Sequence, residues 1–168
     1  ISQALRGRVS NAPVPATADP EAYRLYLEGR FYWNKRTRQA MQKAHDLFEQ
    51  AIARDPKFAL AYSGLADSTN MLTSANVLPR ETVFARAREA AETAVQLDPD
   101  LPEGHASLGL IYAHEFVWAP AEREPRRALA LNPNHTNAML WYSYVLLARG
   151  QAQESLDVVR KALGIDPL

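Results

Sequence analysis

The 168-residue sequence contains no cysteine, which excludes disulfide bonds, thiol catalysis and cysteine-based zinc sites. It also contains no apolar run of the roughly 18 to 20 residues that a membrane-spanning helix needs. Neither sign of charge is in excess, because lysine plus arginine and aspartate plus glutamate number 19 each. Such a balance gives no long-range attraction for nucleic acid or an anionic membrane. We therefore expect neither nucleic-acid binding nor membrane insertion by this chain.

Catalytic and cofactor motifs are missing as well. The sequence has no Gly-x-Ser-x-Gly, no glycine-rich phosphate loop and no His-Glu-x-x-His. Its four histidines are far apart, so a metal site would need several segments to converge. The sequence thus predicts a protein that is not an enzyme and that uses no cofactor and no metal.

What the sequence does contain is one short motif that occurs four times: alanine, an aliphatic residue, two further residues, aspartate or asparagine, and proline. The prolines are Pro56, Pro99, Pro133 and Pro167, separated by 43, 34 and 34 residues. Proline disfavours helical geometry in the residue before it and has no N–H to donate, so each copy predicts a helix end. Recurrence at about this period is typical of stacked-repeat proteins.

Apolar residues recur at helical spacing along the chain, and no segment alternates at the period of a strand. We expect eight helices in four antiparallel pairs, with repeats at about 20–56, 57–99, 100–133 and 134–167. Asp19 and Pro20 provide the N-cap and the first position of the first helix, and residues 73–79 have loop character. Residues 1–18 are interpreted as the remnant of an upstream domain and a proline-containing linker. We interpret the chain as a piece of a larger protein.

These repeats resemble the tetratricopeptide repeat family, whose unit is a helix–turn–helix of 34 residues. The resemblance rests on Leu108-Gly109-x-x-Tyr112 followed by Ala121, Ala128 and Pro133. Equivalent positions recur in register: the small residue of the first helix is Gly29, Ala66, Gly109 or Ser143, and that of the second is Ala44, Ala87, Ala121 or Ser155. The resemblance implies an all-α, right-handed α-solenoid of four helix–turn–helix pairs over residues 19–168.

A narrower resemblance covers residues 19–37 and 121–129, which look like the tetratricopeptide region of bacterial multidomain signalling proteins. In that group the repeats follow a winged-helix DNA-binding domain, an adenylate cyclase or a Ser/Thr kinase. The resemblance implies a regulatory or assembly module of a larger bacterial protein. It implies a cytoplasmic location, or a periplasmic one if the full chain has a membrane span.

Pro125 departs from the family pattern, which prefers a large apolar side chain at this place in the sixth helix. Proline inside a helix removes the bond to the carbonyl of Ala121 and clashes with it, at a cost of roughly 3 kcal/mol. We therefore expect a kink or an irregular first turn over residues 121–125, together with the loss of a packing side chain.

The first helices of stacked helix pairs line a concave surface. Residues three before, one after and four after the small position share this face, and we predict that a protein or peptide ligand binds there. The face changes from aromatic and cationic, through polar, to apolar, which suits a peptide with an acidic group and an apolar anchor. The candidate groove residues are Tyr26, Arg30, Trp33, Ser63, Asp67, Asn70, Ala106, Leu110, Leu140 and Tyr144. Simple packing between helices is the alternative for Leu110 and Leu140, and packing or solvation for Arg30 and Trp33.

The best-known ligand mode of the family is a clamp of lysine, asparagine and arginine on the C-terminal carboxylate of chaperones. The corresponding positions of the first three repeats hold too few cations: Tyr26, Arg30, Gly64, Glu103 and Ser107. We therefore expect no binding of chaperone tails.

The last helix presents Leu156, Val159 and Leu163 with no following helix to cover them. Because end repeats of solenoids need a polar outer face, we expect these side chains to be partly bare. Further repeats in the native chain, or self-association through this face, would cover them. A structural spacer or oligomerisation module without a peptide ligand stays open as an alternative, and so does an activity that no motif reveals.

Overall fold

The computed structural model describes residues 17–71 and 80–166, and within these ranges it contains eight α-helices and no strand. The all-α fold class is confirmed for this part of the chain. The predicted loop at 73–79, nearly all of the predicted N-terminal linker and Pro167 lie outside the described residues. The helices are α1 (Pro20–Asn34), α2 (Arg38–Arg54), α3 (Ala59–Met71), α4 (Arg80–Leu97), α5 (Pro102–His114), α6 (Trp118–Leu131), α7 (Thr136–Ala148) and α8 (Ala152–Ile165).

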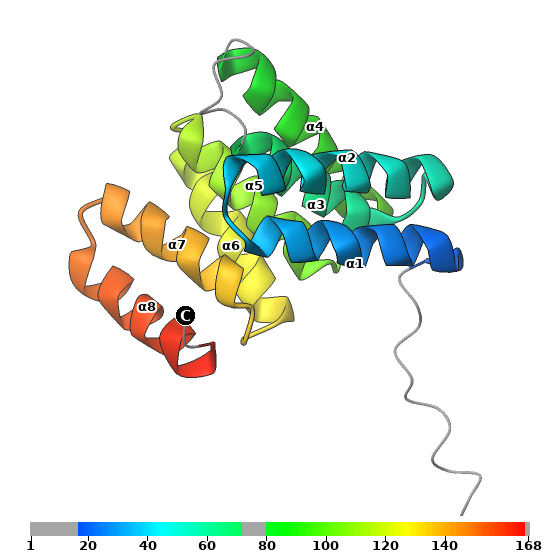
Figure 1. Cartoon of the computed structure of the whole chain (residues 1–168). Coiled ribbons are helices and arrows are strands. Elements are labelled where there is room, and N and C mark those ends of the chain that lie inside the picture. Colours follow the sequence, from blue (N-terminus) through cyan, green and yellow to red (C-terminus); the bar gives the residue numbers. More distant parts are fainter. Residues whose placement is uncertain (1–16, 72–79, 167–168) are drawn as a thin grey trace, which may run out of the picture.

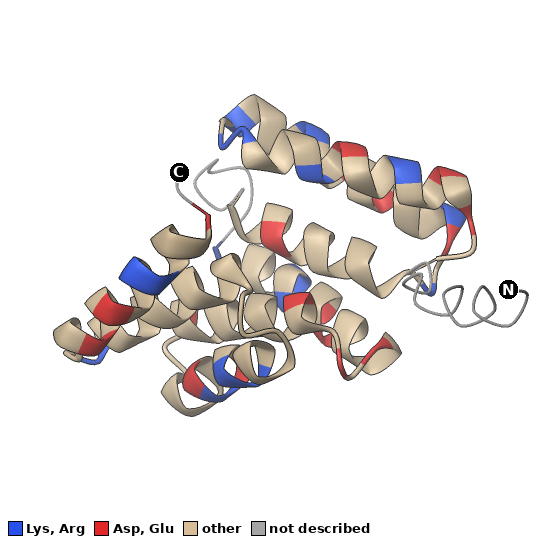
Figure 2. Cartoon of the chain, turned by 90° about the horizontal axis from the view of Figure 1, so that it is seen from below, with Lys and Arg blue, Asp and Glu red and all other residues tan. Residues whose placement is uncertain are grey.

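The helices pack in four consecutive pairs, α1 with α2, α3 with α4, α5 with α6 and α7 with α8. The first helix of each pair also packs on the first helix of the next, so α1, α3, α5 and α7 form one continuous inner layer. Figure 1 shows the pairs following one another from α1 and α2 (blue to cyan) to α7 and α8 (orange to red). This arrangement is the predicted α-solenoid of helix pairs. Charges of both signs are interspersed over it (Figure 2).

The motif that occurs four times predicts the helix ends because its residues form the hydrogen bonds that end each helix. The N–H groups of Asp55, Asp98 and Asn132 donate to the carbonyl of the motif alanine four residues earlier, at 2.9, 2.9 and 2.8 Å. The side-chain oxygen of the same residue then accepts the N–H two positions later, at 3.0, 3.1 and 3.1 Å. Aspartate and asparagine are suited to this turn, and the proline between the two groups has no N–H to leave unsatisfied. The helix ends before Pro56, Pro99 and Pro133 are therefore confirmed.

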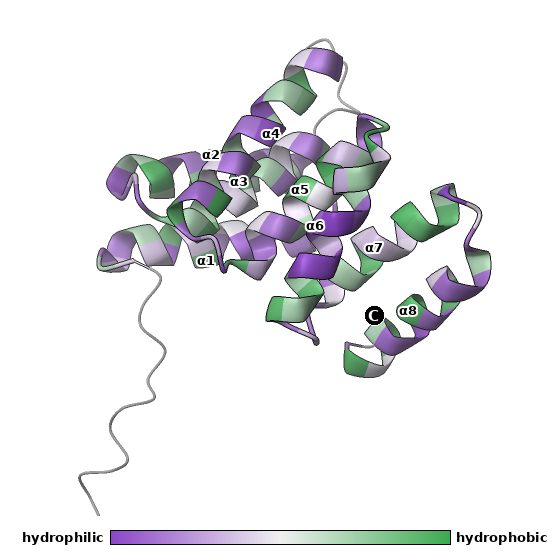
Figure 3. Ribbon diagram, turned by 180° about the vertical axis from the view of Figure 1, so that it is seen from behind, coloured by the Kyte–Doolittle hydropathy of each residue, from purple (hydrophilic) through white to green (hydrophobic). Residues whose placement is uncertain are grey.

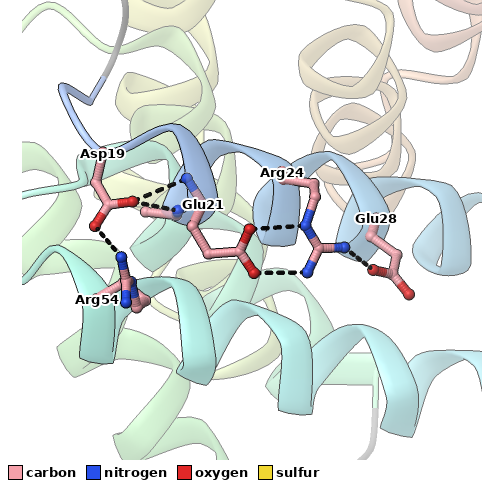
Figure 4. Close-up of polar contacts among 6 residues, drawn as sticks. Asp19, Glu21, Arg24, Glu28 and Arg54 are labelled. Atoms are coloured by element: carbon pink, nitrogen blue, oxygen red, sulfur yellow. Dashed lines mark hydrogen bonds and ion pairs between the residues drawn. The ribbon is translucent and has the colours of Figure 1, made fainter.

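Polar contacts join the start of α1 to the end of α2 in the first helix pair (Figure 4). Asp19 caps α1 by accepting the N–H groups of Glu21 and Ala22 at 2.9 and 3.1 Å, as predicted. Its second carboxylate oxygen lies 3.0 Å from the guanidinium of Arg54 at the end of α2. The backbone N–H of Ala22, above all, and the Arg54 charge lower the pKa of Asp19. The start of α1 is thus held against the end of its partner helix.

Pro125 corrects a prediction. It lies inside α6, which runs without a break from Trp118 to Leu131, so the expected irregular first turn is absent from this segment, while the expected kink stays a prediction. The ring is fully buried against Gly109 of α5: a Cβ atom built on Gly109 would lie 2.3 Å from the proline Cγ and 2.4 Å from its Cδ. The packing side chain is therefore not lost, because the pyrrolidine ring fills the space that glycine leaves.

Candidate protein-interaction surface

All ten predicted groove residues lie on the inner helices α1, α3, α5 and α7. Seven of them are buried: Tyr26, Trp33, Ser63, Asp67, Asn70, Ala106 and Leu110. Of the other three, Arg30 and Leu140 are half-buried, and Tyr144 is 44% exposed. The accessible members of the set therefore lie at two places, on the first and the last inner helix.

One cause of this burial is Trp141 of α7, which the sequence analysis did not single out as a contact across the stack. Trp141 packs on Ala106 and Ala128 of the neighbouring repeat, and also on the apolar cluster formed by α1, α2 and α3. A fourth-repeat side chain thus contacts the beginning of the solenoid. Its size and apolar character were visible in the sequence, but its reach depends on the curvature of the stack.

A polar cluster occupies the middle of the inner layer. The hydroxyl of Ser107 on α5 donates to Asp67 Oδ1 on α3 at 2.6 Å, and Ser63 Oγ lies 3.5 Å from the same hydroxyl. Burial raises the pKa of Asp67, against the opposing effects of the Ser107 hydrogen bond and the Arg30 charge. A buried carboxylate costs folding free energy unless cations or donors surround it. The cluster therefore places a costly anionic group beneath the inner surface.

Two guanidinium groups converge on Trp33 at the end of α1. The Arg36 Cζ atom lies 3.5 Å from the centre of the indole ring and the Arg30 Cζ atom 5.1 Å from it. Trp33 itself is 1% exposed, and this burial favours a packing role. Its Nε1 atom finds no hydrogen-bond acceptor in the described part of the chain.

The backbone of Arg36 has a φ of 53°, in the left-handed region. For a residue with a side chain this conformation costs roughly 1–2 kcal/mol. Within residues 17–71 and 80–166, neither Arg30 nor Arg36 forms an ion pair. The turn after α1 thus holds two cations over an aromatic ring with no direct ion pair among these residues, although the charge of the buried Asp67 acts on both.

Tyr144 on α7, the last inner helix, packs against His114 of α5. His114 Nδ1 donates a hydrogen bond to Asn70 Oδ1 at 3.0 Å, and burial lowers the pKa of His114. Its ring lies 5.6 Å from that of Phe84 and 5.8 Å from that of Tyr144, measured between ring centres. Tyr144 is therefore held at one edge by His114 while much of its ring stays accessible.

The residues at the positions of the chaperone-tail clamp are buried or contact other residues of the chain. Tyr26 is buried, which raises its pKa to about 12. Gly64 adjoins the ring of Phe48, Ser107 is bonded to Asp67, and Glu103 lies 3.7 Å from the Nε2 atom of His135. No group of three or more metal-ligating side chains occurs among the described residues. No described helix has the length and apolar character needed to cross a membrane.

Known proteins match this arrangement. Residues 119–168 fit the family model of the tetratricopeptide repeat. The crystal structure of TTC0263, a thermophilic tetratricopeptide-repeat protein of Thermus thermophilus, superposes with a TM-score of 0.74 and 21% identity, over 88% of this chain and 75% of that one. Residues 119–168 thus match the tetratricopeptide repeat, and the described chain shares the fold of tetratricopeptide-repeat proteins. The first such domain of Spaghetti (RPAP3), bound to the HSP90 peptide SRMEEVD, superposes with a TM-score of 0.59 and 18% identity, over 82% of this chain and 99% of that one.

The chain also resembles part of a bacterial regulatory protein. The transcriptional regulator HilA of Salmonella paratyphi A is 26% identical over 143 residues, which is 85% of this chain and 26% of HilA. The chain thus spans about a quarter of the length of this relative.

Proposed function

We propose that this tetratricopeptide-repeat chain is a protein-interaction module of a larger bacterial regulatory protein. The ligand is an extended peptide segment that runs along the inner helices. Its acidic group binds Arg30 and Arg36, and its apolar anchor contacts Tyr144 and Leu140 on α7. The observation that carries the proposal is the pair of guanidinium groups on Trp33, which form no direct ion pair with a carboxylate among the described residues.

The physical argument is that exposed cations held in place bind anions at low cost. Arg30 and Arg36 are oriented by the indole ring before a ligand arrives, so less side-chain entropy is lost on binding. Arginine and tyrosine are also the residues that contribute most to interface energies. The similarity to the RPAP3 domain bound to a peptide, and to part of the regulator HilA, supports the same kind of role.

A random peptide library displayed on phage tests this function. Enriched peptides should combine an aspartate or glutamate with an apolar residue further along. In fluorescence polarisation, Arg30→Glu and Tyr144→Ala should each weaken a recovered peptide about tenfold or more, since each removes an interface contact. Arg86→Glu is the matched control, because it makes the same charge change at an exposed site on α4. Absence of enrichment, or binding that neither inner-face variant affects, would contradict the proposal.

Chaperone tails provide a second measurement. A peptide ending in Glu-Glu-Val-Asp should not bind with micromolar affinity, because the buried Tyr26 and the bonded Ser107 stand where the family clamp needs donors and cations. Isothermal titration calorimetry with this peptide and with a recovered library peptide makes the comparison. Micromolar binding of the chaperone tail would contradict the expectation that the inner face lacks the clamp for a C-terminal carboxylate.

A spacer or oligomerisation module is the alternative function. The observation in its favour is the row of exposed apolar side chains along α8, where Leu156 is 50% and Leu163 42% exposed.

A further inference from the structure

The three junctions between consecutive repeats use residues at equivalent positions. The residue two places before the small residue of each first helix contacts the preceding repeat. A Cβ built on Gly64 would lie 2.6 Å from the Phe48 ring, Ser107 bonds to Asp67, and Trp141 packs on Ala106 and Ala128. The residue two places after the small residue also contacts the preceding repeat in the third and fourth repeats.

For that second position, Ile111 packs with Ala66 and Ala87, and Val145 packs with Ala113 and Ala121. In repeats three and four both positions, and in repeat two the first of them, therefore belong to the surface that faces the preceding repeat.

In the first repeat, the same two positions hold Leu27 and Phe31, which are 49% and 58% exposed. Tyr23, one turn before Leu27, is 43% exposed. The three side chains follow one another at i, i+4 and i+8, so they form a single stripe along α1. We call this stripe, Tyr23, Leu27 and Phe31, the start face. The positions of Leu27 and Phe31 are those that face the preceding repeat in the later repeats, and Tyr23 extends the same exposed stripe.

The other side of each junction is also built from equivalent positions. The residue four after the small position of a first helix contacts the following repeat, as Asn70 does with His114 at 3.0 Å and Ala113 does with Val145. In the fourth repeat this residue is Leu147, which is 59% exposed.

The second helices contribute two further positions. The residue after the small position contacts the following repeat in all three cases: His45 with Thr69 at 3.2 Å, Arg88 with Glu115 at 3.0 Å, and Glu122 with Arg149. The residue eight after the small position packs there as well, as Val95 does against Gly104. In the fourth repeat these positions hold Leu156 and Leu163.

We call Leu147, Leu156 and Leu163 the end face. Figure 3 shows the apolar segments of α7 and α8 in green.

We propose that the start face of one copy docks on the end face of a second copy, so that the stack of repeats continues from chain to chain. The two faces are the two halves of a junction that the chain already makes three times internally. Both consist of large apolar side chains, so joining them removes apolar surface from water. Contact between two start faces would pair positions that meet at no internal junction. The contact is therefore head to tail, and such a contact does not close after two copies.

Sedimentation velocity over a concentration series tests the proposal on the chain as described. The sedimentation coefficient of the wild-type chain should rise with concentration without stopping at the value of a dimer. L27E/F31E and L147E/L163E should each remain monomeric, because each lacks one half of the junction. An equimolar mixture of the two should form a heterodimer and nothing larger, because one intact start face and one intact end face remain.

Leu97→Glu is the matched control, since Leu97 is 39% exposed and belongs to neither face. It should associate like the wild type. Circular dichroism confirms that each variant is folded, and the single variants L27E and L163E replace any double variant that is not. A wild-type chain that stays monomeric at millimolar concentration would overturn the proposal. So would an L147E/L163E variant that still dimerises, or a mixture that stays monomeric. Leu27, Phe31 and Leu163 lie outside the inner face, so the outcomes for L27E/F31E and L163E are independent of peptide binding there.

Discussion

Gly109 and Pro125 are each unfavourable inside a helix when taken alone, yet they fit each other across the α5–α6 contact. Glycine loses conformational entropy in a helix, and proline removes a hydrogen bond and clashes with the preceding turn. Here the missing side chain of one makes room for the buried ring of the other, whose Cγ would lie 2.3 Å from a Cβ on residue 109. At the scale of single residues, stability depends on such matched pairs rather than on helix propensity.

Gly109→Ala should therefore destabilise the chain by roughly 1–3 kcal/mol, the usual cost of overpacking a well-filled core. The proline ring cannot rotate away as a flexible side chain could. Gly164→Ala should have the opposite sign and stabilise by up to about 1 kcal/mol, because nothing lies within 4 Å of its Cβ position. Urea denaturation measures both. In G109A/P125A, removal of the ring should recover part of the loss, and equal losses with and without the ring would contradict this account.

The α5–α6 pair is also joined by polar contacts at the scale of the helix. His105 Nδ1 lies 2.7 Å from Glu124 Oε2, and its Nε2 lies 2.9 Å from the carbonyl oxygen of Pro99. Both acceptors are oxygens, so the ring donates from both nitrogens when it is protonated. The hydrogen bond to Glu124 raises the pKa of His105, and the same bond lowers the pKa of Glu124.

These opposite shifts give the pair a defined pH window. The raised pKa of His105 stabilises the fold below the ordinary value of 6.5, and this contribution is lost as the pH rises through the folded-state pKa. The lowered pKa of Glu124 stabilises above the ordinary value of 4.5 and is lost as the pH falls through its folded-state pKa. The pair therefore contributes most between these two ordinary values.

Glu124→Gln should lower the free energy of unfolding by about 1–3 kcal/mol inside that window, the usual worth of a hydrogen bond to a charged group. The difference from wild type should shrink at higher pH, because a neutral imidazole keeps one N–H and can no longer donate to both Glu124 and the Pro99 carbonyl. Urea denaturation at a series of pH values measures it. Glu154→Gln, at an exposed site on α8, is the control and should show a small difference that does not follow this window. A loss for E124Q that is independent of pH would contradict the assignment.

At the scale of the whole molecule, Trp141 distinguishes this chain from a simple row of repeats. In an idealised solenoid each repeat contacts only its neighbours, so stability is a sum of local terms. Trp141 of the fourth repeat also packs on the cluster of α1, α2 and α3. The first and last parts of the stack are therefore coupled directly.

Trp141→Ala should destabilise the chain by roughly 2–4 kcal/mol, somewhat below the usual cost for a fully buried tryptophan because this one is only half-buried. It should also make unfolding less cooperative, since the contact between distant repeats is lost. Hydrogen exchange should then speed up in α1 and α3 as well as in α7. Faster exchange confined to the third and fourth repeats would show that Trp141 acts only on its neighbours. Leu97→Ala is an exposed control of apolar character.

The sequence by itself determined the fold class, the eight helices and three helix ends at Pro56, Pro99 and Pro133. These depend on neighbouring residues: proline at a helix end, aspartate or asparagine before it, and apolar residues at helical spacing. It also placed all ten groove candidates on the inner helices, because a regular helix determines which residues share a face. Their part in ligand binding stays a prediction.

Only the tertiary structure decided which of these residues are accessible. In the folded chain Trp33 is buried beneath Arg30 and Arg36, and Pro125 packs against Gly109. Trp141 contacts the apolar cluster of α1, α2 and α3. Each of these depends on where one helix lies relative to another. These relative positions follow from the curvature of the stack. The curvature in turn arises from many small packing contacts between residues far apart in the sequence.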